Sequence, residues 1–199
     1  MKLNVSELFY SLQGEGLNAG VPSIFIRLQG CKAKFACAKS GVKCDTEFES
    51  GKEQDVKDLA IKIGLMTSCK QIVWTGGEPT DQLTEEIVSY FKDLGFFQCI
   101  ETSGLNPVPY GIDFITLSPK VAEHILKKNF PNGVMEIKYV RHKGQEIPQP
   151  SVKAFAYMIS PHSNGWEIDT ENVKHCINLC LQNPTWRMSI QQHKLWNVL

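Results

Sequence analysis

The sequence lacks an excess of charge of either sign. Its 199 residues hold 21 Lys and Arg against 21 Asp and Glu, so the formal net charge is zero. Without a net positive field, the chain has no general attraction for nucleic acid or for an anionic membrane surface, and any anionic ligand must be held by local groups. We therefore expect no nucleic-acid partner.

Long hydrophobic runs are also absent. No stretch approaches the roughly 20 apolar residues that cross a bilayer, and the first ten residues are not a basic region followed by an apolar one. These absences predict a cytoplasmic protein with no membrane partner. Cysteine is sparse as well, because seven residues, an odd number, are too few to staple a small secreted domain with disulfides.

What is present is the composition of one globular domain. Hydrophobic residues make up 42% of the chain, enough to bury a core over residues 1–199. Short runs of β-branched and aromatic residues alternate with segments of helical spacing, which predicts βα units and a largely parallel sheet. The expected strands are 24–28, 71–75, 97–102, 114–117, 134–139, 154–159 and 188–191. The expected helices are 56–65, 84–94, 121–128 and 170–181.

The length restricts the form of that sheet. A closed eight-unit barrel takes about 250 residues, and the repeats found here are too few for one. We expect an α/β fold in the form of a partial, incomplete TIM-like βα barrel or an open sheet. In such folds the chemistry lies at the carboxyl ends of the strands, in the loops that lead into helices.

Three cysteines, Cys31, Cys37 and Cys44, fall within fourteen residues directly after the first expected strand. Thiolates are the soft ligands that zinc and iron–sulfur clusters require, and a set of three leaves a fourth position open for another ligand. The alternative is three unrelated small hydrophobic residues. Cys176 and Cys180 lie on the apolar stripe of an expected helix, where core packing is the better interpretation.

A glycine-rich turn follows the second expected strand. Gly76-Gly77-Glu78-Pro79 places two glycines, an acid and a proline immediately before a helical segment. Two glycines let the backbone approach a ligand without obstruction by a Cβ atom. The alternative is a plain strand-to-helix turn with proline near the first helical position.

The cysteines and the turn together resemble the radical S-adenosylmethionine (SAM) superfamily. Further segments narrow the resemblance to the 7-carboxy-7-deazaguanine synthase family. These segments occur in family order: 9–16 (FYSLQGEG), 25–31 (FIRLQGC), 44–46 (CDT), 101–104 (ETSG), 118–120 (SPK), 136–138 (EIK) and 186–194 (WRMSIQQHK). The resemblance implies one domain over residues 1–199, with the partial barrel of radical SAM enzymes.

The resemblance also implies an activity. Family members convert 6-carboxy-5,6,7,8-tetrahydropterin into 7-carboxy-7-deazaguanine with loss of ammonia, a lyase-type reaction on the route to queuosine and other 7-deazapurines. A [4Fe-4S] cluster, SAM and Mg²⁺ are the expected cofactors, and the reduced cluster cleaves SAM to a 5′-deoxyadenosyl radical. The small-molecule pterin, an electron donor such as flavodoxin or ferredoxin, and a second copy of the chain in a homodimer are the expected partners.

Site residues carried over from the resemblance fall into three sets. Cluster ligands would be Cys31, Cys37 and Cys44, with Thr46 as the magnesium ligand. SAM would contact Lys43, Cys44, Asp45, Gly77, Ser118, Pro119 and Lys120. The substrate would contact Leu12, Gln13, Gly14, Arg27 and Thr75.

Some of these residue types suit their roles. Arg27 offers a planar fork for the substrate carboxylate, against the alternative of a surface ion pair. One threonine hydroxyl suffices for Mg²⁺, which keeps several waters, although a threonine after Cys-Asp is otherwise a turn residue. Glu15 and Glu101 are candidate partners for pterin nitrogens, or instead structural partners of Arg27 or caps. His193 suits a structural role better than a catalytic one.

The cysteine spacing departs from the family pattern. Family members have Cys-x3-Cys-x2-Cys, whereas this chain has Cys31-x5-Cys37-x6-Cys44, with Gly41 where the middle cysteine would stand. Because the cost of closing a loop grows slowly with its length, three thiolates can still reach one cluster. Two other functions stay open at this point: a small radical SAM activase of a glycyl-radical enzyme, and a non-enzymatic zinc-binding module.

Overall fold

The computed structural model describes residues 1–34, 49–163 and 165–198. The strands of these ranges are β1 (Lys2–Leu12), β2 (Pro22–Leu28), β3 (Lys52–Asp55), β4 (Gln71–Gly76), β5 (Phe97–Thr102), β6 (Phe114–Leu117), β7 (Val134–Arg141), β8 (Ala154–Pro161) and β9 (Trp186–Met188). The helices are α2 (Val56–Met66), η1 (Pro79–Asp81), α3 (Glu85–Asp93), α4 (Glu123–Asn129), α5 (Thr170–Gln182) and α6 (Gln192–Trp196).

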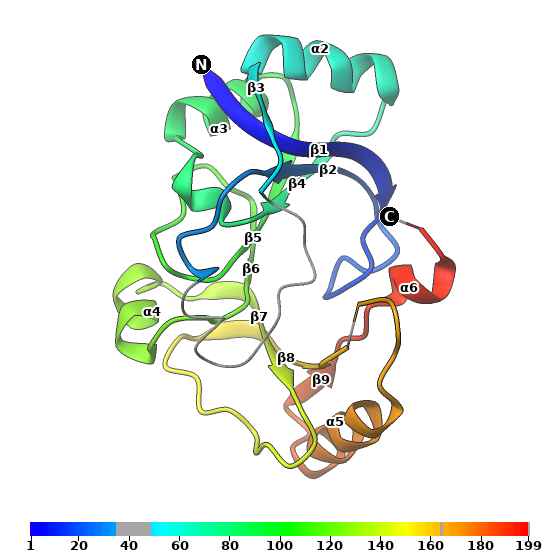
Figure 1. The fold of residues 1–199 in the computed structure, drawn as a ribbon. Helices are drawn as coiled ribbons and strands as arrows, with labels where there is room; N and C mark the ends of the chain where they lie inside the picture. The colour runs from blue at the N-terminus through cyan, green and yellow to red at the C-terminus, as the bar shows by residue number, and fades with distance from the viewer. Residues whose placement is uncertain (35–48, 164, 199) are drawn as a thin grey trace.

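These strands form one mixed sheet in the order β3-β1-β2-β4-β5-β6-β7-β8-β9. From β2 to β9 all neighbours are parallel, whereas β1 is antiparallel to both β2 and β3. The sheet curves into an open arc, with α6 and the C-terminus at its open side (Figure 1). The largely parallel, incomplete barrel is therefore as predicted.

The predicted elements differ from the observed ones mainly before α2 and after α5. The antiparallel strands β1 and β3 and the short helix α6 were not predicted, and β9 lies at Trp186–Met188 rather than 188–191. The cysteine segment and the glycine turn consequently follow β2 and β4. Strand β1 is hard to find because its pairing with β2 shifts between Val5 and Glu7, and this bulge interrupts the alternation of apolar and polar residues.

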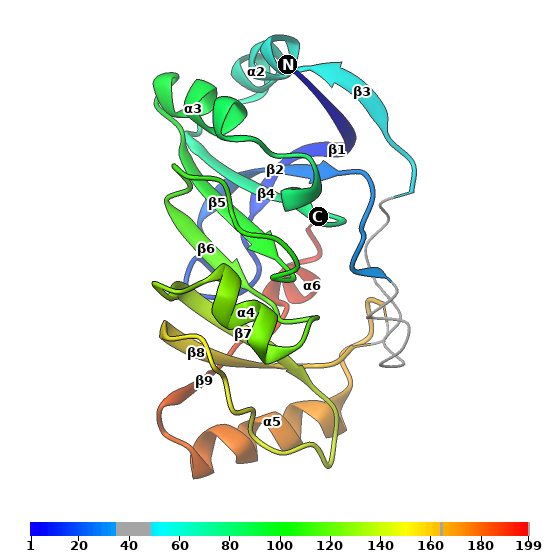
Figure 2. The same cartoon turned by 90° about the vertical axis from the view of Figure 1, so that its left-hand side faces the viewer.

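The convex face of the sheet holds the main hydrophobic core. Helices α2 and α3 cover it (Figure 2), and their buried side chains include Leu59, Ile63 and Phe91. Both helices begin at a capping residue, because the Asp55 and Thr84 side chains accept hydrogen bonds from backbone N–H groups of the first turn. The helices thus fix the outer side of β2, β4 and β5.

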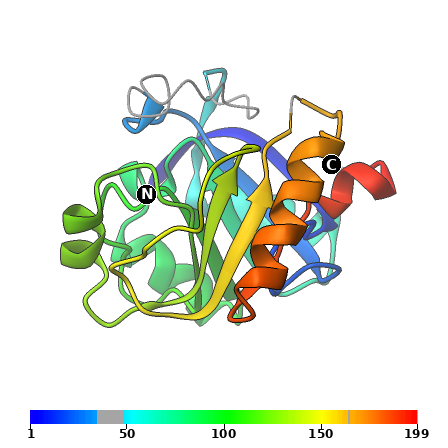
Figure 3. The same cartoon turned by 90° about the horizontal axis from the view of Figure 1, so that it is seen from below.

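A second core lies under α4 and α5. Helix α5 runs alongside β8 (Figure 3) and buries Cys176 and Leu179. Cys180 packs against the same cluster, so the predicted packing role of Cys176 and Cys180 is confirmed. Leu181, near the end of α5, is 76% exposed, because the buried stripe of this helix runs through Asn172, Cys176 and Leu179.

The concave face is layered. An apolar layer is made by in-register residues of adjacent strands, with Phe25 beside Val73, Val73 beside Cys99, and Cys99 beside Phe114. Phe9 stacks on Phe25 with ring centroids 4.9 Å apart and closes this layer. Inward-facing residues two positions further along each strand form the next layer, nearer the carboxyl ends. Within the described ranges, no helix is long and apolar enough to cross a membrane.

Candidate active site

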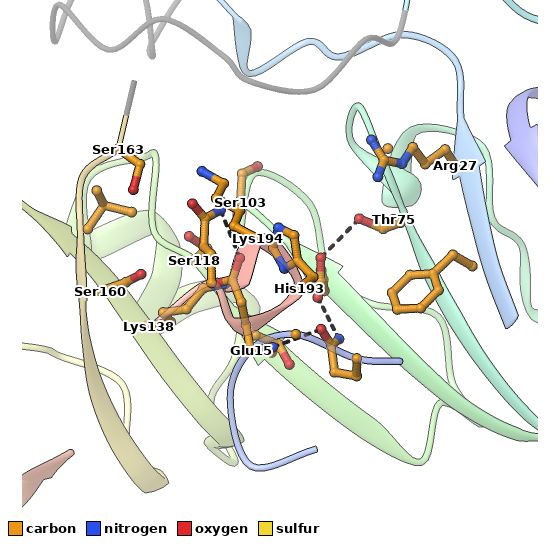
Figure 4. Close-up of a pocket in the computed structure, with 18 of the residues that line it drawn as sticks. Glu15, Arg27, Thr75, Ser103, Ser118, Lys138, Ser160, Ser163, His193 and Lys194 are labelled. Atoms are coloured by element: carbon orange, nitrogen blue, oxygen red, sulfur yellow. Dashed lines mark hydrogen bonds and ion pairs between the residues drawn. The ribbon is translucent and has the colours of Figure 1, made fainter. Parts of the chain in front are cut away.

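A cavity of about 530 Å³ opens on the concave face at the carboxyl ends of the strands. Figure 4 shows Arg27 and Thr75 on one side of it and Ser118, Lys138 and Ser160 on the other. The cavity brings together most of the predicted site residues that the structure describes: Leu12, Gln13, Gly14, Arg27, Cys31, Thr75, Gly77, Ser118 and Lys120. Pro119 is half-buried between two of them but does not line the cavity.

A polar layer crosses five parallel strands, and all of its members except Glu136 line the cavity. Arg27 of β2 pairs in register with Thr75 of β4, and Glu101 of β5 with Thr116, which in turn pairs with Glu136 of β7. This layer, the polar row, lies two residues beyond the apolar layer on the same face. Lys138 follows Glu136 by two residues, so its side chain faces the cavity too.

Arg27 stands at one end of the polar row. Its Nε atom lies 3.3 Å from Glu7 Oε2, and its guanidinium carbon lies 5.2 Å from the centre of the Phe9 ring. Arg27 Nε is buried and makes no hydrogen bond within the described residues. The side chain retains 27% exposure toward the cavity, so the planar fork is available to an anionic ligand.

Glu101 holds two of the predicted substrate-binding side chains. Its Oε1 accepts a hydrogen bond from Gln13 Nε2 at 3.0 Å, and its Oε2 accepts one from Thr75 Oγ1, also at 3.0 Å. Gln13 Oε1 in turn accepts the Glu15 N–H at 3.1 Å, which fixes the direction of the amide. The alternative that Glu101 or Glu15 is the structural partner of Arg27 is wrong, because that partner is Glu7.

Glu15 and Lys138 form an ion pair in the floor of the cavity, with side-chain exposures of 15% and 11%. Glu15 Oε1 also accepts from Gln191 Nε2 at 3.0 Å. Burial by itself would raise the pKa of Glu15, but the Lys138 ammonium and these hydrogen bonds outweigh it and lower that pKa. Burial would likewise lower the pKa of Lys138, but the charges of Glu15 and Glu101 raise it, so both groups stay charged.

Glu136 ends the polar row as a buried carboxyl group. It accepts the Leu17 N–H at 2.7 Å and the Thr116 hydroxyl at 2.8 Å. Burial is the main cause that raises its pKa, with these hydrogen bonds working against the rise. Gly16 lies against this group, since a Cβ atom there would stand 2.2 Å from Glu136 Oε1.

The glycine turn is braced by Glu78, which is completely buried. Its carboxylate accepts hydrogen bonds from Thr102 Oγ1 at 2.7 Å, from the Ser103 N–H at 2.8 Å and from the Ser103 hydroxyl. Thr80 Oγ1 donates to it as well, at 2.7 Å. Glu78 therefore ties the end of β4 to the end of β5, and it acts as a structural brace rather than as a group exposed to a ligand.

The same turn fastens the segment that carries Cys31. The Gly77 N–H donates to Leu28 O at 2.9 Å, and the Glu78 N–H donates to Gly30 O at 3.0 Å. A Cβ atom at Gly77 would stand 1.8 Å from Gly30 O, so only glycine permits this approach. The Glu78 and Pro79 carbonyl oxygens accept N–H groups of the residues that follow, so the glycine carbonyl oxygens are the groups that the turn can offer to a ligand.

Asp81 holds Lys32, the residue that follows Cys31. Its carboxylate accepts the Lys32 N–H at 3.0 Å and lies 3.6 Å from Lys32 Nζ. The loop after β6 is anchored in a similar way, because the Ser118 and Lys120 N–H groups donate to Thr102 O and Ser103 O. The ends of β2, β4, β5 and β6 thus form one hydrogen-bonded rim.

The last helix closes the opposite side of the cavity. The Gln192 N–H donates to Gly14 O at 2.9 Å, and a Cβ atom at Gly14 would stand 2.1 Å from His193 Nδ1. His193 also makes an edge contact with the Trp166 ring, at 6.2 Å between centroids. Gly14 is therefore needed for the close approach of α6, and His193, which packs on Gly14, also lines the cavity.

The chain resembles known enzymes over its whole length. It is 35% identical to the 7-carboxy-7-deazaguanine synthase of Haemophilus influenzae, with 96% of this chain and 92% of that protein covered. The chain belongs to the 7-carboxy-7-deazaguanine synthase family. The synthase of Burkholderia multivorans is also 35% identical, with 100% of both chains covered. The crystal structure of QueE from Escherichia coli has a TM-score of 0.70 and 25% identity, with 97% of this chain and 95% of that chain covered.

Membership confirms the predicted family and enzyme class, and the likeness to QueE confirms the predicted partial barrel. No protein-family model matches the chain.

Some of the residues predicted to bind the cluster, SAM and magnesium lie outside the described residues: Cys37, Lys43, Cys44, Asp45 and Thr46. Within the described ranges, no group of three or more His, Cys, Asp or Glu side chains could hold a metal ion.

Thr116 and Lys138 line the cavity, and the buried Glu136 is hydrogen-bonded to Thr116, but none of the three was predicted as a site residue. A signal for them exists in the sequence, because ionisable residues seldom occur inside strands that are otherwise apolar unless they are paired or functional. Glu136 and Lys138 interrupt the apolar run of β7 in this way. Their partners on distant segments, Leu17 and Glu15, could not be read from spacing.

The Glu15–Lys138 pair makes a prediction for stability. Glu15→Gln leaves a buried ammonium without its counter-charge, which should lower the free energy of unfolding at pH 7 by about 3 kcal/mol. Because folding lowers the pKa of Glu15, its stabilisation is complete above the unfolded value of about 4.3 and is lost as pH falls through the folded pKa. Urea unfolding of wild type and variant between pH 3 and 7 measures this difference.

The control is Glu53→Gln, which breaks the exposed Lys2–Glu53 pair. This variant should unfold close to wild type at every pH, since exposed ion pairs add little stability. If Glu15→Gln and Glu53→Gln have the same free energy of unfolding, the Glu15–Lys138 pair stabilises the fold no more than an exposed ion pair does.

Proposed function

We propose that the protein converts 6-carboxy-5,6,7,8-tetrahydropterin into 7-carboxy-7-deazaguanine with loss of ammonia, as a radical SAM enzyme of queuosine biosynthesis. The observation that carries this proposal is the polar row, which lies in the cavity that Cys31 and the Gly77 turn also line. Family membership supports the same reaction.

The described residues fit the cofactors of this reaction. Cys31 is held at the cavity by the Gly77 turn, and with Cys37 and Cys44 it would give a [4Fe-4S] cluster three thiolates and one open position. The carbonyl oxygens of the turn suit the SAM ammonium group, while Ser118 and Lys120 line the cavity nearby. We assign Pro119 to the same loop, and Lys43, Asp45 and Thr46 to SAM and Mg²⁺ by resemblance.

The reduced cluster and SAM, when bound, supply a radical that takes a hydrogen atom from the substrate. The residues of the chain bind and orient that substrate. Arg27 would hold its carboxylate as a two-pronged ion pair, and Thr75 and Gln13 would hold the ring, positioned by Glu101. Leu12 and Gly14 complete the wall, and α6 helps to separate the cavity from solvent.

The partners follow from the resemblance. We propose that a flavodoxin or ferredoxin supplies the electron, that two copies of the chain form a homodimer, and that the protein works in the cytoplasm. The neutral charge balance of the chain is consistent with a small-molecule substrate held by local groups such as Arg27 and Lys138.

The direct test is product formation. Protein reconstituted anaerobically with iron and sulfide, then given SAM, Mg²⁺, a reductant and 6-carboxytetrahydropterin, should yield 7-carboxy-7-deazaguanine, detected by mass spectrometry. A reducible cluster that cleaves SAM but yields no such product would contradict the substrate assignment. Stoichiometric zinc without iron after anaerobic purification would instead favour a zinc-binding module.

The cysteine spacing generates a second test. If Cys37 is the second ligand, Cys37→Ala should lose most of its iron and sulfide and the visible absorption of the cluster, because two thiolates hold a [4Fe-4S] cluster poorly. The matched control is Cys69→Ala, which removes a cysteine near the start of β4, away from the cavity lining. Equal iron content in Cys37→Ala and the control would show that Cys37 does not bind the cluster.

A further inference from the structure

The hydroxyl groups of the polar row have a fixed direction. Thr75 Oγ1 lies 3.0 Å from Glu101 Oε2, and Thr116 Oγ1 lies 2.8 Å from Glu136 Oε1. In both contacts the threonine is the donor, so each threonine gives its single hydroxyl proton to the neighbouring carboxyl oxygen. Both hydroxyl oxygens can then offer only lone pairs to a ligand in the cavity.

Glu101 accepts hydrogen bonds on both of its carboxyl oxygens. Besides Thr75, it accepts from Gln13 Nε2 at 3.0 Å, and the orientation of that amide is set by the Glu15 N–H on Gln13 Oε1. The direction of the Thr75 hydroxyl is therefore imposed by a chain of contacts rather than left to the ligand.

The hydrogen-bond donors of the cavity bind a different part of the ligand. Arg27, Lys138 and the second N–H of Gln13 suit oxygen acceptors, such as a carboxylate or a ring carbonyl. A 6-carboxypterin carries both of these groups in every oxidation state. These donors therefore hold the pterin without distinguishing its reduced form from its oxidised form.

We propose that the acceptors of the polar row, with Thr75 set by Glu101, select the oxidation state of the pterin. Tetrahydropterin presents N–H groups at both N5 and N8, 7,8-dihydropterin presents one at N8, and the aromatic pterin presents lone pairs at both. A lone pair facing an acceptor forms no hydrogen bond and leaves both groups desolvated. Glu101 is in this account a positioning residue and Thr75 a contact. The inference rests on the proposed function and adds the basis of its substrate specificity.

The test compares affinities rather than turnover. Reconstituted protein with SAM and no reductant is titrated anaerobically with 6-carboxytetrahydropterin, 6-carboxy-7,8-dihydropterin and 6-carboxypterin. Affinity should fall in that order, with about 10- to 100-fold between the first and the last, since an unsatisfied buried acceptor costs about 1–3 kcal/mol.

Two variants test whether the affinity ratio depends on the hydrogen-bond direction of Thr75 or only on the packing of the site. In Glu101→Gln the amide can still accept from Gln13 and can donate its N–H to Thr75, which frees the threonine proton for the ligand. The affinity ratio should therefore shrink to within about threefold. Thr75→Val should weaken the tetrahydropterin and not the oxidised pterin, and Thr75→Ser should restore the wild-type ratio. Glu171→Gln, an exposed carboxyl group on α5, is the control and should match wild type.

The outcomes distinguish a failure of the proposed selection from a failure of the proposed reaction. Equal affinity for all three pterins in the wild type, or a wild-type ratio in both Glu101→Gln and Thr75→Val, would overturn the selection while leaving the proposed reaction intact. If no pterin binds, the proposed substrate is wrong and the selection is overturned with it.

Discussion

The register of the parallel strands is the constraint on which the site depends. It places Arg27, Thr75, Glu101, Thr116 and Glu136 at one level of the concave face, directly above an apolar layer. Five residues from five strands thereby become neighbours. A shift of one residue in any strand would turn its polar group onto the convex face, into one of the two hydrophobic cores under the helices.

Carboxylates connect this layer to its surroundings, each by a different set of contacts. Glu101 joins β4 to the β1–β2 loop, Glu136 joins β6 to the same loop, and Glu78 joins β4 to β5. Carboxylates removed from water are costly unless their oxygens accept hydrogen bonds, and the buried Glu78 and Glu136 and the half-buried Glu101 all do. The same carboxylates therefore position the site residues and stabilise the fold, so that the geometry of the site is set before a ligand binds.

Much of this could be predicted from the sequence, because the local signals are strong. The parallel strands β2 and β4 to β8 appear as short apolar runs, and the motif residues Arg27, Thr75 and Gly77 stand at the ends of such runs. What could not be predicted depends on contacts between distant segments. Examples are the Glu15–Lys138 pair, the packing of His193 on Gly14, and the pairing of β1 across a bulge. Spacing along the chain carries no record of these contacts.

The central claim is that the polar row holds the pterin, with Arg27 on its carboxylate. The most direct measurement is the affinity of wild type and Arg27→Gln for 6-carboxytetrahydropterin and for the same tetrahydropterin without its carboxyl group. The account predicts that Arg27→Gln weakens the carboxylated ligand about 10- to 100-fold, as the loss of a charged hydrogen-bonding partner requires, and leaves the other ligand unchanged. Equal weakening of both ligands, or of neither, would contradict it.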